Sequence, residues 1–509
     1  MKRFPAIYPP LLAAYPILSL YASNQSLIPL HDLWRPLGAV VGGTILLWLL
    51  LGLVLRDAQK GAIAATTVAA GFLNLHLLSQ VIPFPKDSVT SVATSGIIIL
   101  GLAALLASKW KWHRPLSFFS IVIVALPTFQ IVSAQIGQER ASGTPELATN
   151  NKIKERPDVV YIILDGYGRS DVLKQIYDYD NRDFIDGLVK RGFYVAKESH
   201  TNYCQTELSI SSSLNHAFIP DITTILRPVE TDGRPNFREA LQNSAVSLRL
   251  KALGYQTSAI TTGFPSLDFP TVDRKAITPA GVNLLESTLI QRLPFGSQSG
   301  AVASMFIERR RLIKQAFAKL STLSDQGSIP QFTIAHILAP HPPFSFGPNG
   351  EELPKKGSFA YYDGSDYMTM IADKETYRTG YANQAKFISN QILKSLDAIL
   401  AKGGERPIIV IQGDHGPKMG LDQSVYERTD IHECFPILNA YLVPDNVQKE
   451  LYASITPVNT FRTIFRTMFG DNLPDLPDRS WYSPYGAPLN FTEVTQRLAT
   501  EESQIKKAG

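Results

Sequence analysis

Two short motifs place carboxylate and imidazole side chains where a metal ion could bind. Asp165 lies in the segment LDGYG directly after an apolar run, and Asp414 and His415 stand side by side in GDHG after another. A carboxylate paired with an imidazole suits Zn²⁺ or Mn²⁺ better than Ca²⁺, which prefers oxygen ligands. Taken singly, each motif also fits a structural role, since Asp is a common helix cap and DHG can form a turn.

Three further histidines are candidate site residues. His336 and His341 lie in HILAPHPPF, and His432 lies in TDIHECF. An imidazole can bind a metal ion, hold an anionic substrate or transfer a proton, although a lone histidine more often has a structural role. The strand-to-loop context of the pair favours a functional interpretation for His336 and His341.

A hydroxyl-rich segment, residues 202–215 with the sequence NYCQTELSISSSLN, could supply a nucleophile. A Thr or Ser at the N-terminus of a helix lies in the field of the helix dipole, which also stabilises a phosphate, but the composition selects no single hydroxyl. Cys204 in this segment and Cys434 are the only cysteines, so a disulfide-built scaffold and a cysteine-rich zinc module are excluded. Outside the cytoplasm the two could form one disulfide or remain buried thiols.

The pattern of elements explains how these residues could meet. Strand-like runs alternate with helical periodicity from Pro157 onward, which indicates parallel strands with helices on both faces. Ligands of such sheets bind beyond the carboxyl ends of the strands, where Asp165, His341 and Asp414 are expected. The predicted strands are Asp158–Asp165, Gln256–Thr262, Gln331–Leu338, Pro407–Gln412 and Phe435–Val443. The predicted helices are Phe184–Arg191, Glu239–Leu253, Val302–Leu323, Thr376–Leu400 and Val458–Met468.

The first 138 residues differ from the rest in charge and hydrophobicity. Residues 1–134 hold nine basic and three acidic residues, against 49 and 45 in the whole chain. Five segments lack Asp, Glu, Lys and Arg, and each could form a bilayer-spanning helix of about 20 residues: Phe4–Leu30, Leu37–Leu55, Gly61–Pro85, Ser88–Ser108 and Pro115–Gln138. We expect a transmembrane domain of about five helices over residues 1–138. A cleaved signal peptide is the alternative for the first segment, and buried helices of a soluble protein are the alternative for the set.

Basic residues between these segments predict the orientation. With the N-terminus in the cytoplasm, seven of them lie inside and only Arg35 and Lys86 lie outside, as the positive-inside rule favours. Five spans then place three parts outside the cytoplasm: a polar linker at 139–156, a domain at 157–478 and a polar tail at 479–509, to which no role is assigned. The net charge of +4 and the 18% of charged residues do not support a nucleic-acid-binding protein.

Together these features resemble the alkaline phosphatase and sulfatase superfamily. Within it, the membrane-anchored branch of lipoteichoic acid synthases and phosphoethanolamine transferases is the most similar. The resemblance is carried by Asp165 at a strand end, a hydroxyl 41 positions later, the DHG motif, and membrane helices before an external domain. It covers about Pro157 to Leu473, and it implies a three-layer α/β/α sandwich of the sulfatase type.

The resemblance implies roles for individual residues. Four of them match the ligands of one divalent metal ion (Mn, Zn or Mg, with Ca less favoured): Asp165, Thr206, Asp414 and His415. Thr206 also matches the nucleophile at the start of a helix that continues to Leu214. His341 matches a histidine that contacts substrate, and His336 matches a second histidine of the phosphoethanolamine transferases. His432 is a further candidate ligand.

The implied function is a metal-dependent hydrolase or transferase anchored in the cell membrane. Its substrates would be phosphoesters of membrane lipid headgroups or envelope glycans, attacked by a threonine. The sequence departs from the sulfatase pattern, because Cys204 opens CQTEL rather than C-x-P-x-R and Gly166 replaces a second Asp. A sulfate-ester hydrolase is the alternative enzyme. A catalytically silent membrane protein that binds a partner is the alternative from another class.

Overall fold

The computed structural model divides into two compact units. One comprises Met1–Pro145, Gly281–Met305 and Gly357–Phe359, and the other comprises Glu146–Ala280, Phe306–Lys356 and Ala360–Gly509. The residues that the structure describes are 6–23, 30–73, 96, 113–139, 156–223, 226–228, 235–264, 267, 269, 272–275, 300–323, 329–353, 365, 367–368, 373–401 and 405–508.

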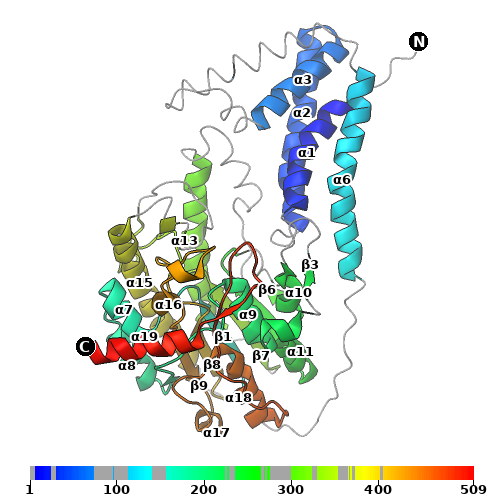
Figure 1. The fold of residues 1–509 in the computed structure, drawn as a ribbon. Coiled ribbons are helices and arrows are strands. Elements are labelled where there is room, and N and C mark those ends of the chain that lie inside the picture. The colour runs from blue at the N-terminus through cyan, green and yellow to red at the C-terminus, as the bar shows by residue number, and fades with distance from the viewer. Residues whose placement is uncertain are drawn as a thin grey trace. The chain divides into compact units, whose positions relative to one another are not determined.

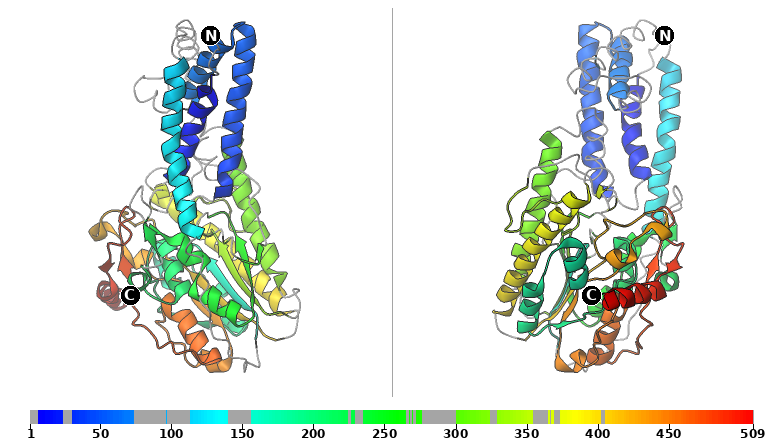
Figure 2. Two further views of the ribbon diagram at one scale, coloured as in Figure 1. Left: turned by 90° about the vertical axis from the view of Figure 1, so that its right-hand side faces the viewer. Right: turned by 60° about the vertical axis from the view of Figure 1, so that its left-hand side comes forward.

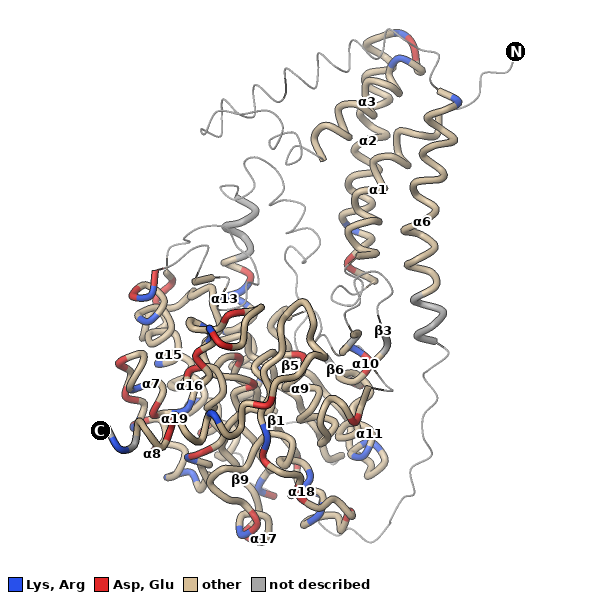
Figure 3. Tube along the Cα trace, viewed as in Figure 1, with Lys and Arg blue, Asp and Glu red and all other residues tan. Residues whose placement is uncertain are grey.

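Apolar helices make up the described part of the first unit. They are α1 (Tyr8–Ala22), the short η1 (Leu30–Leu33), α2 (Trp34–Val54), α3 (Ala58–Leu73) and α6 (His113–Glu139). Figure 3 shows how few charged residues they carry. Two segments, Leu30–Val54 and His113–Ser133, are helices long and apolar enough to cross a membrane. Large apolar side chains on both are exposed, including Leu53 at 76% and Phe118 at 72%, as expected for surfaces that face lipid.

Four of the five predicted membrane segments contain a described helix. The fifth, Ser88–Ser108, lies outside the described residues apart from Gly96, and so does most of the linker at 139–156. A bundle of five spans therefore stays a prediction, while an N-terminal region with two helices of membrane-spanning length is observed.

A seven-stranded sheet forms the centre of the second unit (Figure 1), in the order β2–β9–β8–β1–β7–β5–β6. Its strands are β1 (Val159–Leu164), β2 (Tyr194–Val195), β5 (Gln256–Thr261), β6 (Arg274–Lys275), β7 (Gln331–Ile337), β8 (Ile408–Gly413) and β9 (Asn439–Leu442). Outside it lie two hairpins, β3 (Arg227–Pro228) with β4 (Pro235–Asn236) and β10 (Trp481–Tyr482) with β11 (Thr492–Glu493).

The central strands are parallel, as predicted, but β9 is not. β1 pairs in parallel with β7 and β8, whereas β9 is antiparallel to β8 and β2. A parallel neighbour would need a crossover to the opposite end of the sheet, and the chain instead returns at the end where β8 finishes. The predicted strand Phe435–Val443 is also too long. Its first residues form isolated bridges, Pro436 with His200 and Ile437 with Gly168.

Helices cover both faces of this sheet (Figure 2). The helices with residues in this unit are α7 (Ser170–Tyr177), α8 (Arg182–Lys190), α9 (Thr206–Asn215), η3 (Ile219–Ile222), α10 (Phe237–Gln242), α11 (Ala245–Ala252), α13 (Gly300–Leu320), α15 (Lys374–Leu400), η7 (Tyr426–Arg428), α16 (Ile431–Cys434), α17 (Asp445–Gln448), α18 (Pro457–Phe469) and α19 (Thr495–Ala508). The helix predicted at Glu239–Leu253 divides in two, because Ser244 is extended and caps α11.

Alternate side chains of β1 enter two separate cores. Val160, Ile162 and Leu164 belong to the core that contains buried residues of α7, α8, α13 and α15. Val159, Tyr161 and Ile163 belong to the core that contains those of α9, α10, α11 and α18. The period of two along the strand therefore produces the predicted layers of helix, sheet and helix.

Candidate active site

Two neighbouring strands place the first candidate residues together. β1 and β8 pair in register from Val159 with Ile408 to Leu164 with Gly413. Asp165 and Asp414 each follow the last paired residue, so both emerge at the carboxyl edge of the sheet. The sequence motif and the parallel pairing thus create one site from residues that are 249 positions apart in the chain.

Glycines allow the loops to approach each other closely. Gly166 has a φ of +75°, a conformation that residues with a Cβ adopt at a cost. Its N–H donates to Asp414 Oδ1 at 3.0 Å. A Cβ on Gly413 would lie 2.3 Å from the carbonyl oxygen of Tyr167, and one on Gly416 would lie 2.3 Å from that of Glu433. The glycines of GDHG are therefore required by close backbone packing.

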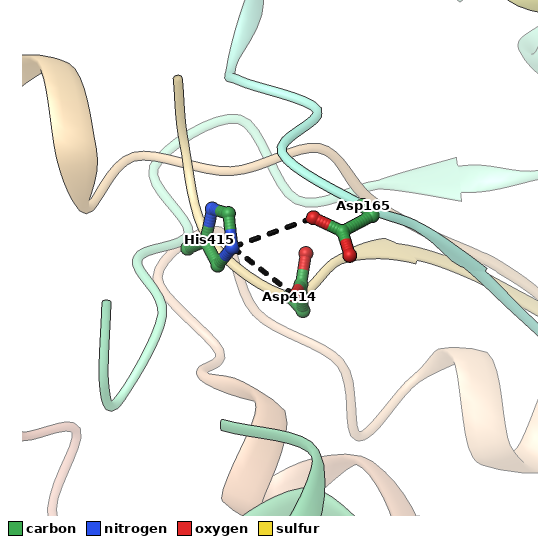
Figure 4. Close-up of side chains that lie close together, drawn as sticks. All are labelled: Asp165, Asp414 and His415. Atoms are coloured by element: carbon green, nitrogen blue, oxygen red, sulfur yellow. Dashed lines mark ion pairs between the residues drawn. The ribbon is translucent and has the colours of Figure 1, made fainter. Parts of the chain in front are cut away.

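The side chains of Asp165, Asp414 and His415 point toward one another (Figure 4). One ligand atom of each lies within 4.8 Å of the other two. His415 Nε2 is 3.5 Å from Asp165 Oδ1 and 3.3 Å from Asp414 Oδ2. All three residues are at least 98% buried, and ionised groups so far from water need a compensating charge.

The hydrogen bonding around these atoms fits a metal cation. Asp165 Oδ1 and Asp414 Oδ2 are buried, and neither has a hydrogen-bond partner among the described residues. His415 Nδ1 donates to the carbonyl oxygen of Gly416 at 2.8 Å, which leaves the lone pair of Nε2 facing the two carboxylates. A backbone acceptor on the far nitrogen is how proteins orient a metal-binding histidine. The donor set of two oxygens and one nitrogen suits a divalent ion such as Zn²⁺ or Mn²⁺.

Thr206 joins this group from the other side. It is the first residue of α9, and its Oγ1 lies 3.1 Å from His415 Nε2. The preceding Gln205 is extended, so the first N–H groups of α9 lack helical partners and can bind an anion. The fourth residue implied by the resemblance therefore lies where a nucleophile could meet both a metal ion and a phosphate.

His336 supports Asp165 from the neighbouring strand. It is fully buried on β7, in register with Ile163 of β1, and its Nε2 lies 3.1 Å from Asp165 Oδ2. Burial alone would raise the pKa of Asp165, but His341, His336 and His415 together hold that pKa below its usual range. Asp165 is thus kept ionised, as a metal ligand must be.

His341 lies next to the same group. Its ring centroid is 6.4 Å from that of His415, and its backbone N–H donates to the carbonyl oxygen of Asp165 at 3.0 Å. Its Nδ1 donates to the carbonyl oxygen of Pro342 at 2.6 Å, and this bond fixes the orientation of the ring.

His432 and the two cysteines lie elsewhere. His432 Nε2 is 3.3 Å from Gln175 Oε1, and His432 is not part of the group formed by the two Asp residues and His415. Cys204 and Cys434 are buried thiols in one apolar cluster. Of the two alternatives for the cysteines, the structure therefore has buried thiols and not a disulfide.

Sequence reasoning missed the buried side chains that hold the site loops. The Tyr381 hydroxyl donates to the carbonyl oxygen of Gly166 at 2.8 Å, and Gln384 Nε2 donates to that of His341 at 3.1 Å. Arg309 Nη2 also donates to the carbonyl oxygen of His341, at 2.7 Å. These residues lie on α13 and α15, and no sequence signal distinguishes them from ordinary residues of an amphipathic helix.

Comparison with protein families decides the class. The model of the family described as Sulfatase matches residues 157–461, more than half of the chain. The chain belongs to the sulfatase family. This membership confirms the predicted superfamily, and the matched residues include the whole group from Asp165 to His415. A comparison with curated proteins gave no match.

The chain is also similar to several solved structures. The sulfatase-family chain is similar to the periplasmic domain of EptC from Escherichia coli in complex with Zn, at 11% identity and a TM-score of 0.43, over 69% of this chain and 97% of that one. It is also similar to the integral membrane lipooligosaccharide phosphoethanolamine transferase A (EptA) from Neisseria meningitidis. The identity is 11% and the TM-score 0.42, over 91% of this chain and 94% of that one. A third similar structure is that of phosphonate monoester hydrolase of Agrobacterium radiobacter. The identity is 12% and the TM-score 0.42, over 64% of this chain and 80% of that one.

Proposed function

We propose that this protein is a membrane-anchored, metal-dependent phosphotransferase or phosphodiesterase with Thr206 as its nucleophile. Its substrates would be phosphoesters of membrane lipid headgroups or envelope glycans. The observation that carries the proposal is the position of Thr206 Oγ1, 3.1 Å from His415 Nε2 at the N-terminus of α9. A hydroxyl there can be activated and can face a phosphate at the same time.

One divalent metal ion, Zn, Mn or Mg, is the cofactor of this proposal. Its ligands would be Asp165, Thr206, Asp414 and His415, and the unpartnered oxygens of the two carboxylates support that assignment. When bound, such an ion lowers the pKa of a coordinated hydroxyl and neutralises charge on the phosphate. Ca²⁺ is less suitable because one ligand is an imidazole.

The residues of the chain would divide the reaction into two displacements. Thr206 Oγ1 loses its proton to solvent and forms a bond to phosphorus, while the bond from phosphorus to the leaving oxygen breaks. His341, charged and protonated at Nε2, gives that proton to the leaving alkoxide. The N–H groups at the start of α9 stabilise the equatorial oxygens. Water or an acceptor hydroxyl then attacks the phosphothreonine and gives its proton to neutral His341. The bond from phosphorus to Thr206 Oγ1 breaks, and Oγ1 takes back a proton from solvent.

A sulfate-ester hydrolase is the second candidate, because the family as a whole carries the sulfatase description. The position of Cys204 weighs against it. Cys204 is 1% exposed and lies in an apolar cluster with Tyr482 and Cys434, and the residues after it are Gln205 and Thr206 rather than those of C-x-P-x-R.

The proposed location follows from the N-terminal helices. Two helices of membrane-spanning length and the excess of basic residues in the predicted inner connections support several spans. The N-terminus would lie in the cytoplasm and the sulfatase domain outside it. Residues 1–138 then form the anchor, 139–156 the linker and 157–478 the catalytic domain.

The test uses the full chain, purified in detergent, stripped of metal and reloaded with Zn²⁺, Mn²⁺ or Mg²⁺. Bis-p-nitrophenyl phosphate, p-nitrophenyl phosphate and p-nitrophenyl sulfate are compared in wild type, Thr206→Ala and Thr206→Ser. We expect metal-dependent phosphoester turnover that falls about 1000-fold or more in Thr206→Ala and is partly retained in Thr206→Ser. A phosphorylated Thr206 peptide should be detectable by mass spectrometry during turnover.

The control is Thr223→Ala, which removes an exposed hydroxyl that donates to the carbonyl oxygen of Pro220 at 3.2 Å. It should leave turnover unchanged. Turnover of the sulfate alone, or full phosphoester activity in Thr206→Ala, would contradict the proposal.

A further inference from the structure

The C-terminal tail lies against the segment that leads into the proposed nucleophile. Residues 479–502, here called the strap, follow the part of the chain that the family model matches and are drawn toward red in Figure 1. They comprise the hairpin of β10 and β11 and the first half of α19. The strap contacts residues 421–435, for example through the Tyr482 hydroxyl, which donates to the carbonyl oxygen of Asp422 at 2.8 Å. It also contacts residues 200–205, which contain no helix and no strand beyond isolated bridges.

Three hydrogen bonds join the strap to the four residues before the nucleophile. Asn202 Nδ2 donates to the carbonyl oxygen of Arg479 at 2.8 Å, and Gln205 Nε2 donates to that of Ser483 at 2.8 Å. In the opposite direction, the N–H of Trp481 donates to the carbonyl oxygen of Asn202 at 2.9 Å. The irregular segment therefore takes part of its hydrogen bonding from the strap. Other bonds come from elsewhere in the domain, such as the N–H of Val458 in α18, which donates to Asn202 Oδ1 at 2.9 Å.

Ser480 connects the strap to the metal-ligand loop through one intermediate residue. Its hydroxyl donates to the carbonyl oxygen of Thr201 at 2.6 Å. The Thr201 hydroxyl in turn donates to the carbonyl oxygen of Asp414 at 2.6 Å. Ser480 is 3% exposed and Thr201 is fully buried, so both bonds are shielded from competing water and are costly to break.

Aromatic packing covers the same segment. The ring of Trp481 stacks on Tyr203, with centroids 5.4 Å apart and an interplanar angle of 20°. Trp481 also meets Phe218 edge to face at 4.6 Å. Tyr203 is fully buried, and its hydroxyl accepts a hydrogen bond from the N–H of Ile219 at 3.0 Å. The indole thus packs against the chain before α9 and the chain after it.

An ion-pair cluster anchors the far end of the strap. Glu502 Oε1 lies 2.5 Å from Arg169 Nη2 and 2.8 Å from His200 Nε2. Arg169 belongs to the loop that begins at Asp165, and His200 to the segment that leads to Thr206. The carboxylate therefore links both loops of the site to α19.

We propose that the strap is the positioning element of the nucleophile: Ser480, Trp481 and Glu502 hold residues 200–205 so that Thr206 stays within reach of the metal-ligand group. The inference rests on the proposed role of Thr206. None of the three side chains touches the reacting atoms, so they are positioning residues, and their loss should lower kcat much more than it raises KM.

The test compares Ser480→Ala with Ser483→Ala in the full chain. Ser483 provides a matched control, because its hydroxyl is equally buried in the strap but has no hydrogen-bond partner among the described residues. Amide hydrogen exchange of a peptide covering 200–210 is measured beside that of a peptide covering 159–164. Metal content, kcat and KM are measured in the same samples.

We expect Ser480→Ala to speed exchange in 200–210 and not in 159–164. It should lower kcat about 10- to 100-fold with KM and metal content near wild type. Ser480→Thr should restore both exchange and kcat, and Ser483→Ala should change neither. Faster exchange of both peptides would indicate general destabilisation and would overturn the proposal, as would identical behaviour of the two alanine variants.

The exchange measurement also separates this inference from the proposed function. Suppose that the wild type turns over no phosphoester while Ser480→Ala still speeds exchange in 200–210 and not in 159–164. That result would contradict the proposed chemistry and support the role of the strap. Suppose instead that the wild type is active and Ser480→Ala matches it in both exchange and kcat. That result would contradict the positioning role of the strap and leave the proposed chemistry supported.

Discussion

The proposed metal-ligand side of the site and the proposed nucleophile side are held in place by different means. Asp165 and Asp414 follow adjacent parallel strands that share six paired positions. Thr206 follows an irregular segment whose side chains bond to the strap, as Asn202 does to the carbonyl oxygen of Arg479, 277 positions away. Side chains of the strap bond to the segment in turn, as Ser480 does to the carbonyl oxygen of Thr201. Backbone hydrogen bonds of the sheet fix the positions of Asp165 and Asp414, whereas contacts that involve side chains fix the position of the segment before Thr206.

This difference predicts where the site is rigid. Backbone pairing in the middle of a sheet opens only with large parts of the domain, but a loop held by a few side-chain contacts can open locally. We therefore expect changes on the sheet side to act through metal binding, and changes on the strap side to act through the position of Thr206.

The largest effect is expected at Asp165, and it tests whether the carboxyl end of β1 binds the metal ion. Asp165→Asn removes a negative ligand atom, so bound metal should be lost and kcat/KM should fall about 1000-fold. Asp158→Asn is the matched control, because Asp158 precedes the same strand at its other end and accepts a hydrogen bond from the N–H of Gln331 at 2.7 Å. Metal analysis and phosphoester turnover of both variants decide the matter. Equal effects would mean that the change acts on the fold of β1 and not on the site.

A smaller effect is expected at the neighbouring strand. His336→Gln weakens the support of Asp165 Oδ2, and loss of such a partner typically costs about 10- to 100-fold in metal affinity. His432→Gln should leave the affinity unchanged, because His432 contacts Gln175 instead of the ligand group. Competitive metal titration measures both. A greater loss in His432→Gln than in His336→Gln would return His432 to the ligand set.

The smallest expected effect is a pH dependence of stability on the sheet side. The buried Glu433 carboxylate accepts hydrogen bonds from the Tyr177 hydroxyl and from the N–H groups of Met419 and Gly420, just beyond DHG. Burial raises its pKa to about 7 from 4.5. Between these two pH values the folded protein holds a proton that the unfolded chain has lost, so stability is highest at the lower pH and decreases as the pH rises toward 7.

Melting temperatures of wild type and Glu433→Gln across this pH window measure the effect. Wild type should lose a few degrees more than the variant as the pH rises. Parallel curves for the two proteins would show that Glu433 does not titrate in this window.

Several elements of the site could be predicted from sequence because they depend on local pattern. The apolar runs before Asp165 and Asp414 are β1 and β8. The helix that the family resemblance places from Thr206 onward is α9. Parallel pairing was expected from the alternation of strands and helices, and it places the two Asp residues at one edge. The antiparallel β9 was missed, because strand direction depends on the route of the connecting chain rather than on the residues of the strand.

By itself, the sequence determined the alternation of strands and helices and the apolar character of the N-terminal region, because periodicity and charge act over a few neighbouring residues. Short motifs gave the class of domain and the residue types of the proposed metal-ligand group. Only the tertiary structure decided which distant side chains hold that group in place. The sequence assigns no role to the polar tail. In the structure Ser480, Trp481 and Glu502 of this tail contact residues that are far away in the chain. Such contacts arise from packing in three dimensions, and no local pattern of residues encodes them.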